Sequence, residues 1–172
     1  MKSRMARGQL SSLELNAWRG LLRTHARLEQ ELDRKLLEAE GLSLSSYEVL
    51  LRLVQADGRR VRMRDIADSL LISRSGLTGI VNELERRGYV ARERAADDGR
   101  GIEAVVTKAG LAAFRRAHRV HLASVRDLFL RHLSEEQLQQ LAAVWAAVGT
   151  TTEPDLAPSQ RSTDQRRVSG RS

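Results

Sequence analysis

Residues 63–90 read MRDIADSLLISRSGLTGIVNELERRGYV, and this stretch predicts two short helices joined by a tight turn. Apolar residues recur at helical spacing on both sides of Ser73, a residue type favoured at the N-cap of a helix. Gly88 follows the second apolar series, as glycine often does just past a helix C-terminus. The predicted helices cover residues 64–70 and 74–87. Their inner faces are predicted to consist of Ile66, Ala67, Leu70 and Leu71, and of Leu77, Ile80, Val81 and Leu84.

The segments on either side complete a known order of elements. Upstream, a helix is expected over residues 46–56, followed by an extended piece at 61–63. Downstream, residues 89–94 and 102–106 are expected to be strands joined by a polar turn that contains glycine. Helix, short strand, helix, turn, helix and hairpin in this order are typical of a winged helix-turn-helix. We therefore predict such a domain over residues 43–107.

Long helices are predicted on both sides of this domain. The first covers roughly residues 11–38 and ends at Gly41, another runs from Thr107 to about Arg131, and a last one begins at Ser134. Three of the predicted helices begin with a capping box, in which Ser is followed by Glu or Gln three residues later. These pairs are Ser11/Glu14, Ser45/Glu48 and Ser134/Gln137.

The terminal helices carry more apolar residues than one small core can use. Stripes near period 3.5 are formed by Leu111, Phe114, His118, Leu122, Val125 and Phe129, and by Leu138, Leu141, Trp145 and Val148. We expect residues 10–42 and 108–149 to pair two subunits as a homodimer. The alternative is that these helices pack only on each other within one chain. Residues 150–172, which contain both prolines and lack periodicity, are expected to be a flexible tail.

The predicted fold is therefore mainly α (α+β): a winged helix-turn-helix domain with a helical dimerisation region built from the N- and C-terminal helices. The 172-residue chain contains no cysteine, which excludes disulfides, thiolate nucleophiles and Cys-ligated zinc. It contains no catalytic constellation, phosphate loop or glycine-rich cofactor turn, so neither an enzyme nor a cofactor is expected. No apolar run approaches the ~20 residues of a membrane span, and we expect a cytoplasmic protein.

The basic excess favours a polyanionic partner, and double-stranded DNA is the partner that the helix at 74–87 suits. Lys and Arg number 29 against 22 Asp and Glu, a net charge of +7. With its apolar side turned inward, this helix presents short polar and small side chains that fit a major groove about 12 Å wide. A solvated helix face is the alternative. The residues of this region predicted to contact DNA are Ser73, Arg74, Ser75, Thr78, Gly79, Asn82 and Arg86.

The hairpin adds a cationic tip. Arg100 lies between two glycines, and Asp98 can orient its guanidinium by a charge-assisted hydrogen bond. We predict that Arg100 enters a narrow, A·T-rich minor groove, where negative potential is concentrated. Arg92 and Arg94 lie on one face of the preceding strand and are predicted to take phosphates. An ordinary polar hairpin is the alternative.

Over about residues 10–149, the sequence resembles the MarR-type winged-helix regulators. The segment SRSGLTGIVNELERRGYVAR is similar to the family's recognition helix with its Leu-Glu-x-x-Gly ending. The segment DDGRGIEAVVTKAG is similar to its Asp-x-Arg wing followed by Leu-Thr-x-x-Gly, with Val106-Thr107 where Leu-Thr is usual. Gly79 stands where the family often has a larger polar residue, so one base contact is expected to be missing.

The resemblance implies a homodimer that binds a pseudo-palindromic operator, usually as a repressor. It also implies release by a small molecule, commonly an aromatic or phenolic anion, bound between the dimer helices and the winged domain. Trp18, His25 and Tyr47 are the residues expected to line such an effector site, with plain core packing as the alternative. An architectural DNA-binding protein without ligand control and a winged-helix protein-interaction module remain as rival functions.

His118 and His121 are three residues apart, a spacing that metal sites use. Because no carboxylate cluster joins them in the sequence, we expect His118 within the dimer contact, His121 at its edge and no metal.

Overall fold

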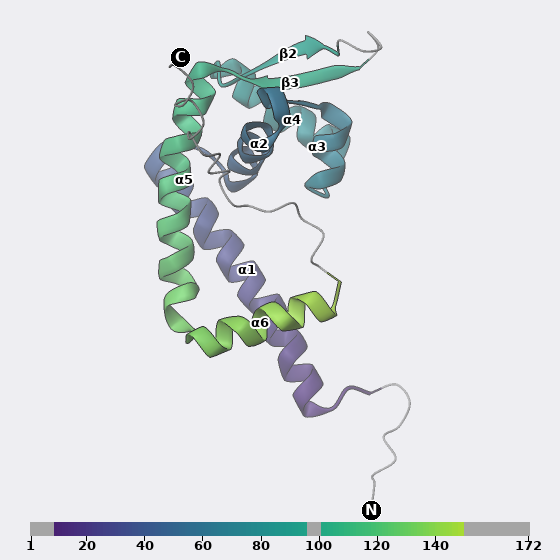
Figure 1. The fold of residues 1–172 in the computed structure, drawn as a ribbon, viewed down its shortest axis with the longest axis vertical. Helices are drawn as coiled ribbons and strands as arrows, with labels where there is room; N and C mark the ends of the chain where they lie inside the picture. The colour runs from purple at the N-terminus through teal and green to yellow at the C-terminus, as the bar shows by residue number, and fades with distance from the viewer. Residues whose placement is uncertain (1–8, 96–100, 150–172) are drawn as a thin grey trace, which may run out of the picture. The chain divides into compact units, whose positions relative to one another are not determined.

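The computed structural model describes residues 9–95 and 101–149, and the chain divides into two units, Met1–His132 and Leu133–Ser172. In the second unit, the described helix is α6 (Glu135–Ala147). The described helices and strands of the first unit are shown in Figure 1 and are α1 (Ser12–Glu40), α2 (Leu44–Gln55), β1 (Arg60–Arg62), α3 (Met63–Ser69), α4 (Arg74–Arg86), β2 (Val90–Arg94), β3 (Ile102–Val106) and α5 (Lys108–Leu128). Single 3₁₀ turns lie at Asp57–Arg59 and Leu130–His132.

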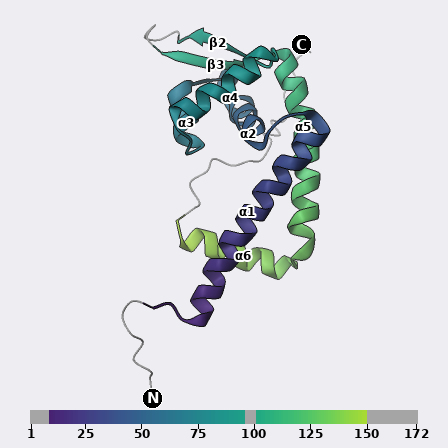
Figure 2. The ribbon, with the colours of Figure 1, turned by 180° about the vertical axis from the view of Figure 1, so that it is seen from behind.

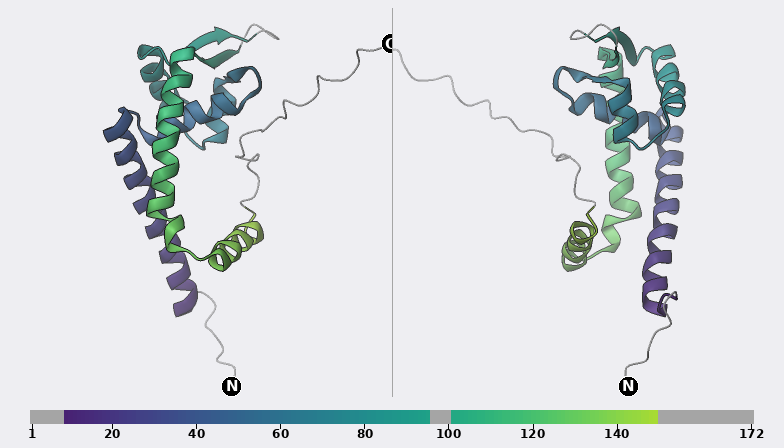
Figure 3. Two further views of the ribbon diagram at one scale, coloured as in Figure 1. Left: turned by 60° about the vertical axis from the view of Figure 1, so that its left-hand side comes forward. Right: turned by 90° about the vertical axis from the view of Figure 1, so that its right-hand side faces the viewer.

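The sheet has three antiparallel strands in the order β1-β3-β2. The predicted extended piece is its edge strand, since Val61 pairs with Ala104 of the central strand β3. The β2–β3 hairpin lies along one edge of the layer formed by α2, α3 and α4 (Figures 1 and 3). A small sheet beside helices confirms the predicted α+β class and the winged helix-turn-helix arrangement.

The core of the first unit lies between α2, α3, α4 and the sheet, and it extends to α1 and α5 through Leu36 and Phe114. The predicted inner face of α4 is confirmed, because Leu77, Val81 and Leu84 are buried and Ile80 packs against them. The face of α3 is confirmed only in part. Ile66 and Ala67 are buried, but Leu71 is 93% exposed. The prediction for Leu71 is wrong because α3 has already ended there, and the residue takes a left-handed φ of 53° that turns its side chain outward.

Side-chain caps begin most of the helices, as the sequence predicted. Capping boxes at Ser11 and Ser134 are both present. The predicted box at Ser45 is wrong, because Ser43 is the N-cap and its Oγ accepts a hydrogen bond from the Ser46 amide at 3.1 Å. The Leu44 amide, next to this cap, donates to Asp33 Oδ1 of α1 at 2.8 Å. A contact with a distant helix thus adds to the start of α2, and the local sequence did not indicate it.

The end of α4 is joined to the start of α5. The amides of Gly88 and Tyr89 donate to the carbonyls of Glu85 and Leu84 at 2.8 and 2.9 Å, which is a Schellman ending with glycine in the left-handed region. The Thr107 hydroxyl caps α5 by accepting from the Gly110 amide at 3.0 Å, and it donates to the Gly88 carbonyl at 2.7 Å. One threonine therefore holds the two helix ends together.

Helices α1 and α5 pack side by side and antiparallel in the first unit (Figure 2). Two ion pairs join them, Lys35 with Asp127 at 3.7 Å and Glu40 with Arg116 at 2.8 Å. Within residues 9–95 and 101–149, no helix combines the length and the apolar character that crossing a bilayer requires.

Part of the apolar stripe predicted to pair subunits is used inside one chain. Phe114 of α5 stacks on Tyr47 of α2 with ring centroids 5.8 Å apart, and His118 Nδ1 lies 2.8 Å from the Tyr47 hydroxyl. At these positions α5 packs on α2 of the winged domain, a contact that neither the predicted subunit pairing nor the alternative of packing among the terminal helices included. Leu122, further along the stripe, is 40% exposed.

Candidate nucleic-acid interface

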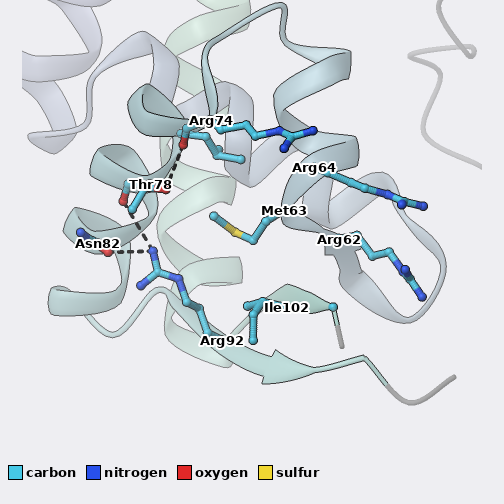
Figure 4. Close-up of a pocket in the computed structure, with 10 residues that line it drawn as sticks. Arg62, Met63, Arg64, Arg74, Thr78, Asn82, Arg92 and Ile102 are labelled. Atoms are coloured by element: carbon cyan, nitrogen blue, oxygen red, sulfur yellow. Dashed lines mark hydrogen bonds between the residues drawn. The ribbon is translucent and has the colours of Figure 1, made fainter. Parts of the chain in front are cut away.

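A basic concave surface lies between the exposed face of α4, the start of α3 and the β2–β3 hairpin (Figure 4). It encloses about 710 Å³. Four arginines line it and none of its lining residues is acidic; we call it the basic groove, and its arginines are Arg62, Arg64, Arg74 and Arg92. This surface is shaped and charged for a polyanion.

Helix α4 supplies one wall of the basic groove through residues that the sequence singled out. Ser73 is the N-cap, as predicted, and its Oγ accepts from the Gly76 amide at 3.1 Å and lies 3.1 Å from Ser75 Oγ. Thr78 donates its hydroxyl proton to the Arg74 carbonyl at 2.9 Å, so its oxygen remains an acceptor on the outer face. Apart from the neighbouring residues and backbone of α4 itself, no heavy atom lies within 4 Å of the position that a Cβ would take at Gly79, so the helix surface is open there.

The arginines of the region differ in how far their charge is already balanced. Within the described part of the chain, no carboxylate pairs with Arg74 or Arg94, whereas Arg64 pairs with Asp65 at 3.1 Å. Arg86 pairs with Glu83, one turn earlier on the outside of α4. Exposed pairs of this kind are weak and break readily when a phosphate competes. Arg74 and Arg94 are therefore the most available cations.

Arg92, which the sequence predicted to bind a phosphate, instead contacts two side chains of α4. Its Nη1 donates to Glu85 Oε2 at 2.6 Å and its Nη2 to Asn82 Oδ1 at 2.7 Å, so a side chain from β2 bridges two residues of α4. Figure 4 shows the guanidinium reaching from the strand to the helix. The sequence alone does not predict this contact, because the residues are seven and ten positions apart and meet only where the hairpin lies against α4.

The start of α3 contributes residues that the sequence prediction did not include. Arg62, Met63 and Arg64 line the basic groove, although only α4 and the hairpin were expected to contact DNA. The available signal was the run of basic residues in RVRMR, residues 60–64, but the side chains that line the groove come from the point where β1 ends at Arg62 and α3 begins at Met63. Asp98 and Arg100, the predicted wing pair, lie outside the described residues.

The three residues predicted to line an effector site do not share one hollow in the described chain. Tyr47 is 2% exposed and faces α5, where its ring also stacks on His121 with centroids 4.5 Å apart. His25 is exposed beside Glu29 and lines a separate hollow of about 580 Å³ between α1 and α2. Trp18 is 53% exposed. Tyr47 thus serves the core, which was the stated alternative.

The cluster of Tyr47, His118 and His121 has shifted acid–base properties. Burial raises the pKa of the Tyr47 hydroxyl, so it stays protonated and can donate to His118 Nδ1. Burial lowers the pKa of both histidines, and for His121 a charge on His118 lowers the pKa further. Nδ1 of His121 is buried and has no hydrogen-bond partner in the described structure. Both rings are therefore biased toward the neutral form. In the described residues, no group of three or more His, Cys, Asp or Glu is placed to hold a metal ion.

Known proteins resemble the chain in sequence and in fold. A model of the MarR family matches residues 40–101. The crystal structure of AbsC, a MarR family transcriptional regulator from Streptomyces coelicolor, is 33% identical, with a TM-score of 0.76 over 83% of this chain and 95% of that chain. Sco3205, a MarR family regulator from the same organism solved in complex with DNA, is 32% identical, with a TM-score of 0.77 over 85% of this chain and 95% of that chain.

One relative in sequence is named as a transcriptional repressor. The transcriptional repressor MprA of Escherichia coli strain K12 is 26% identical over 122 residues. The matched region covers 71% of this chain and 60% of the length of that repressor.

Proposed function

This chain belongs to the MarR family of transcriptional regulators, which are not enzymes, and on that premise we propose that it regulates transcription by binding duplex DNA as a homodimer. Its target would be a pseudo-palindromic operator, with one half-site for each protomer about 34 Å from the other. A regulator of this kind acts where the chromosome is, so we propose that it works in the cytoplasm.

The basic groove is the observation that carries this proposal. Helix α4 presents Ser75, Thr78, Gly79 and Asn82 on an exposed face, and arginines from three neighbouring elements flank it. In this arrangement α4 enters the major groove, and Arg74 at its N-terminus contacts a phosphate or a guanine. Sco3205, which is 32% identical to this chain, was solved in complex with DNA, and this supports DNA as the partner.

Unpaired apolar side chains support the homodimer. Three large apolar side chains in the N-terminal part of α1 are exposed to solvent: Leu13 (79%), Trp18 (53%) and Leu22 (49%). Apolar surface of this extent on one helix is typical of an interaction site. In α6, Val144 is 50% exposed and no residue is buried, and Val148, the C-cap residue of this helix, is 63% exposed. A second protomer would cover such surfaces, so we propose residues 10–42 and 108–149 as the dimerisation region.

Repression, effector release and the wing contact complete the proposal. Because its relative MprA is named a transcriptional repressor, we propose that this protein represses transcription. An aromatic or phenolic anion is the proposed effector, with the exposed Trp18 and His25 of α1 as candidate contacts. Asp98 and Arg100 remain the proposed minor-groove pair on the strength of the sequence alone.

The test is a salt titration of the full-length protein on DNA. Binding to the region upstream of its own gene is compared with binding to a scrambled duplex of equal composition by fluorescence anisotropy. The logarithm of the binding constant should fall linearly with the logarithm of the salt concentration, by ~0.9 for each phosphate neutralised. The genuine site should be preferred by ~10³-fold or more.

Arg74→Ala should reduce that slope by about 1 for each protomer. Arg34→Ala is the control, because Arg34 lies on α1 and is already paired with Glu31 and Glu38 at 2.7 and 2.8 Å. Equal affinity for both duplexes would favour an architectural protein, and a flat salt response would favour a protein-interaction module.

A further inference from the structure

Asn82 is exposed on the outer face of α4, and its side-chain amide is engaged from one side by Arg92. The Arg92 guanidinium donates to Asn82 Oδ1 at 2.7 Å and is itself anchored by Glu85 at 2.6 Å. A further contact of 3.5 Å joins Nη2 to the Thr78 carbonyl, one turn before Asn82. The Arg92 side chain is 26% exposed, so these contacts are partly shielded from water.

The chemistry of arginine fixes which end of the amide faces it. A guanidinium has five donors and no acceptor, so the atom of Asn82 that it contacts must be the carbonyl oxygen. The amide nitrogen is then on the other side, away from Arg92, as Figure 4 shows. Asn82 therefore presents two N–H donors outward while its carbonyl is occupied.

We propose that Arg92 is a positioning residue that makes Asn82 a hydrogen-bond donor toward DNA and thereby sets a preference for guanine at one position of each half-site. This inference rests on the proposed function. An asparagine that reads adenine needs both ends of its amide, since its oxygen accepts from adenine N6 and its nitrogen donates to N7. Guanine instead offers two acceptors, N7 and O6, to a donor. Cytosine, which presents a donor, is disfavoured.

The ion pair with Glu85 makes Arg92 better suited to orienting Asn82 than to binding a phosphate. Its carboxylate balances the Arg92 charge, and a balanced guanidinium gains less from a phosphate than an unpaired one. Arg94 lies on the same face of β2 two residues later, and no described carboxylate pairs with it. In this proposal Arg92 orients Asn82, and Arg94 contacts the DNA backbone.

The experiment is selection of bound duplexes from a randomised library with the full-length protein, followed by sequencing. The wild-type protein should enrich guanine over adenine at one position per half-site by about fivefold, the value of one hydrogen bond. Asn82→Ala should abolish that preference and leave the other positions unchanged. Arg92→Met keeps an apolar stem without donors and should shift the same position toward adenine. Arg92→Lys retains a donor and should restore part of the guanine preference.

Arg94→Met is the matched control, since it should weaken binding to all sequences equally. Thermal unfolding of each variant checks that the hairpin is intact. A uniform loss of affinity in Arg92→Met, with the guanine preference kept, would assign Arg92 to the phosphates and overturn the inference. Adenine at the Asn82 position of the wild-type site would also overturn it. If the wild-type protein enriches no sequence, the proposed function itself fails, which distinguishes the two outcomes.

Discussion

Replacing Gly110 with alanine should destabilise the protein, although alanine normally favours a helix over glycine by ~1 kcal/mol. Gly110 lies in the first turn of α5, directly against the end of α4. A Cβ at this position would lie 2.0 Å from the Tyr89 carbonyl oxygen and 2.9 Å from Val106 Cγ2. Contacts this short require the backbone to move, and overpacking of this kind costs ~1–3 kcal/mol.

The displacement would also weaken nearby hydrogen bonds. The Thr107 amide donates to the Tyr89 carbonyl at 3.0 Å, and such a bond contributes about 1 kcal/mol. The expected loss is therefore ~3 kcal/mol in the free energy of unfolding, or ~6–12 °C in Tm for a chain of this size. The assay is thermal and urea unfolding at constant protomer concentration, because association would shift both.

Gly79→Ala is the control for this prediction. Nothing lies within 4 Å of the position that its Cβ would take, so the ordinary helix preference should raise the stability by ~0.5–1 kcal/mol. Equal or greater stability of Gly110→Ala than of the wild-type protein would refute the argument from close packing between α4 and α5.

Two more predictions concern the cap of α4 and the buried histidines. Ser73→Ala removes the acceptor of the Gly76 amide and should cost ~1 kcal/mol, measured as a Tm lower by ~2–4 °C, whereas no change would mean that the cap contributes nothing. Burial lowers the pKa of His118 and His121 in the folded protein, so the unfolded chain binds protons more readily. The free energy of unfolding should therefore be highest above the unfolded histidine pKa of ~6.5 and should fall as the pH drops below that value. Urea unfolding at a series of pH values measures this, and His121→Gln should flatten the dependence; an unchanged dependence would show that other groups cause it.

Local sequence signals predicted the elements of the first unit well where the cause is local. Ser73, Thr107 and Gly88 mark helix ends because the cap hydrogen bonds and the left-handed conformation involve only neighbouring residues. The apolar face of α4 followed from its period for the same reason. The predicted N-cap of α2 at Ser45 was wrong where a distant contact takes part. The N-cap is Ser43, and the next residue, Leu44, donates its amide hydrogen to Asp33 of α1.

The candidate site shows the same limit. The outward residues of α4 followed from turning the apolar face inward, but the bridge from Arg92 to Asn82 and Glu85 depends on how the hairpin lies against the helix. The contribution of Arg62 and Arg64 to the basic groove depends on β1 joining β3, a pairing across more than forty residues. Tyr47 was ambiguous because a buried aromatic ring and a ligand contact have the same sequence pattern.

The Thr107 hydroxyl joins the Gly88 carbonyl, just past α4, to the Gly110 amide in the first turn of α5, and we expect α4 and α5 to move together through this joint. Helix α5 has 21 residues and is therefore about 32 Å long. A sideways displacement of ~3 Å at its far end would tilt α4 by ~5°, by the same geometry. A displacement along α5 is therefore expected to change the angle at which α4 faces its partner.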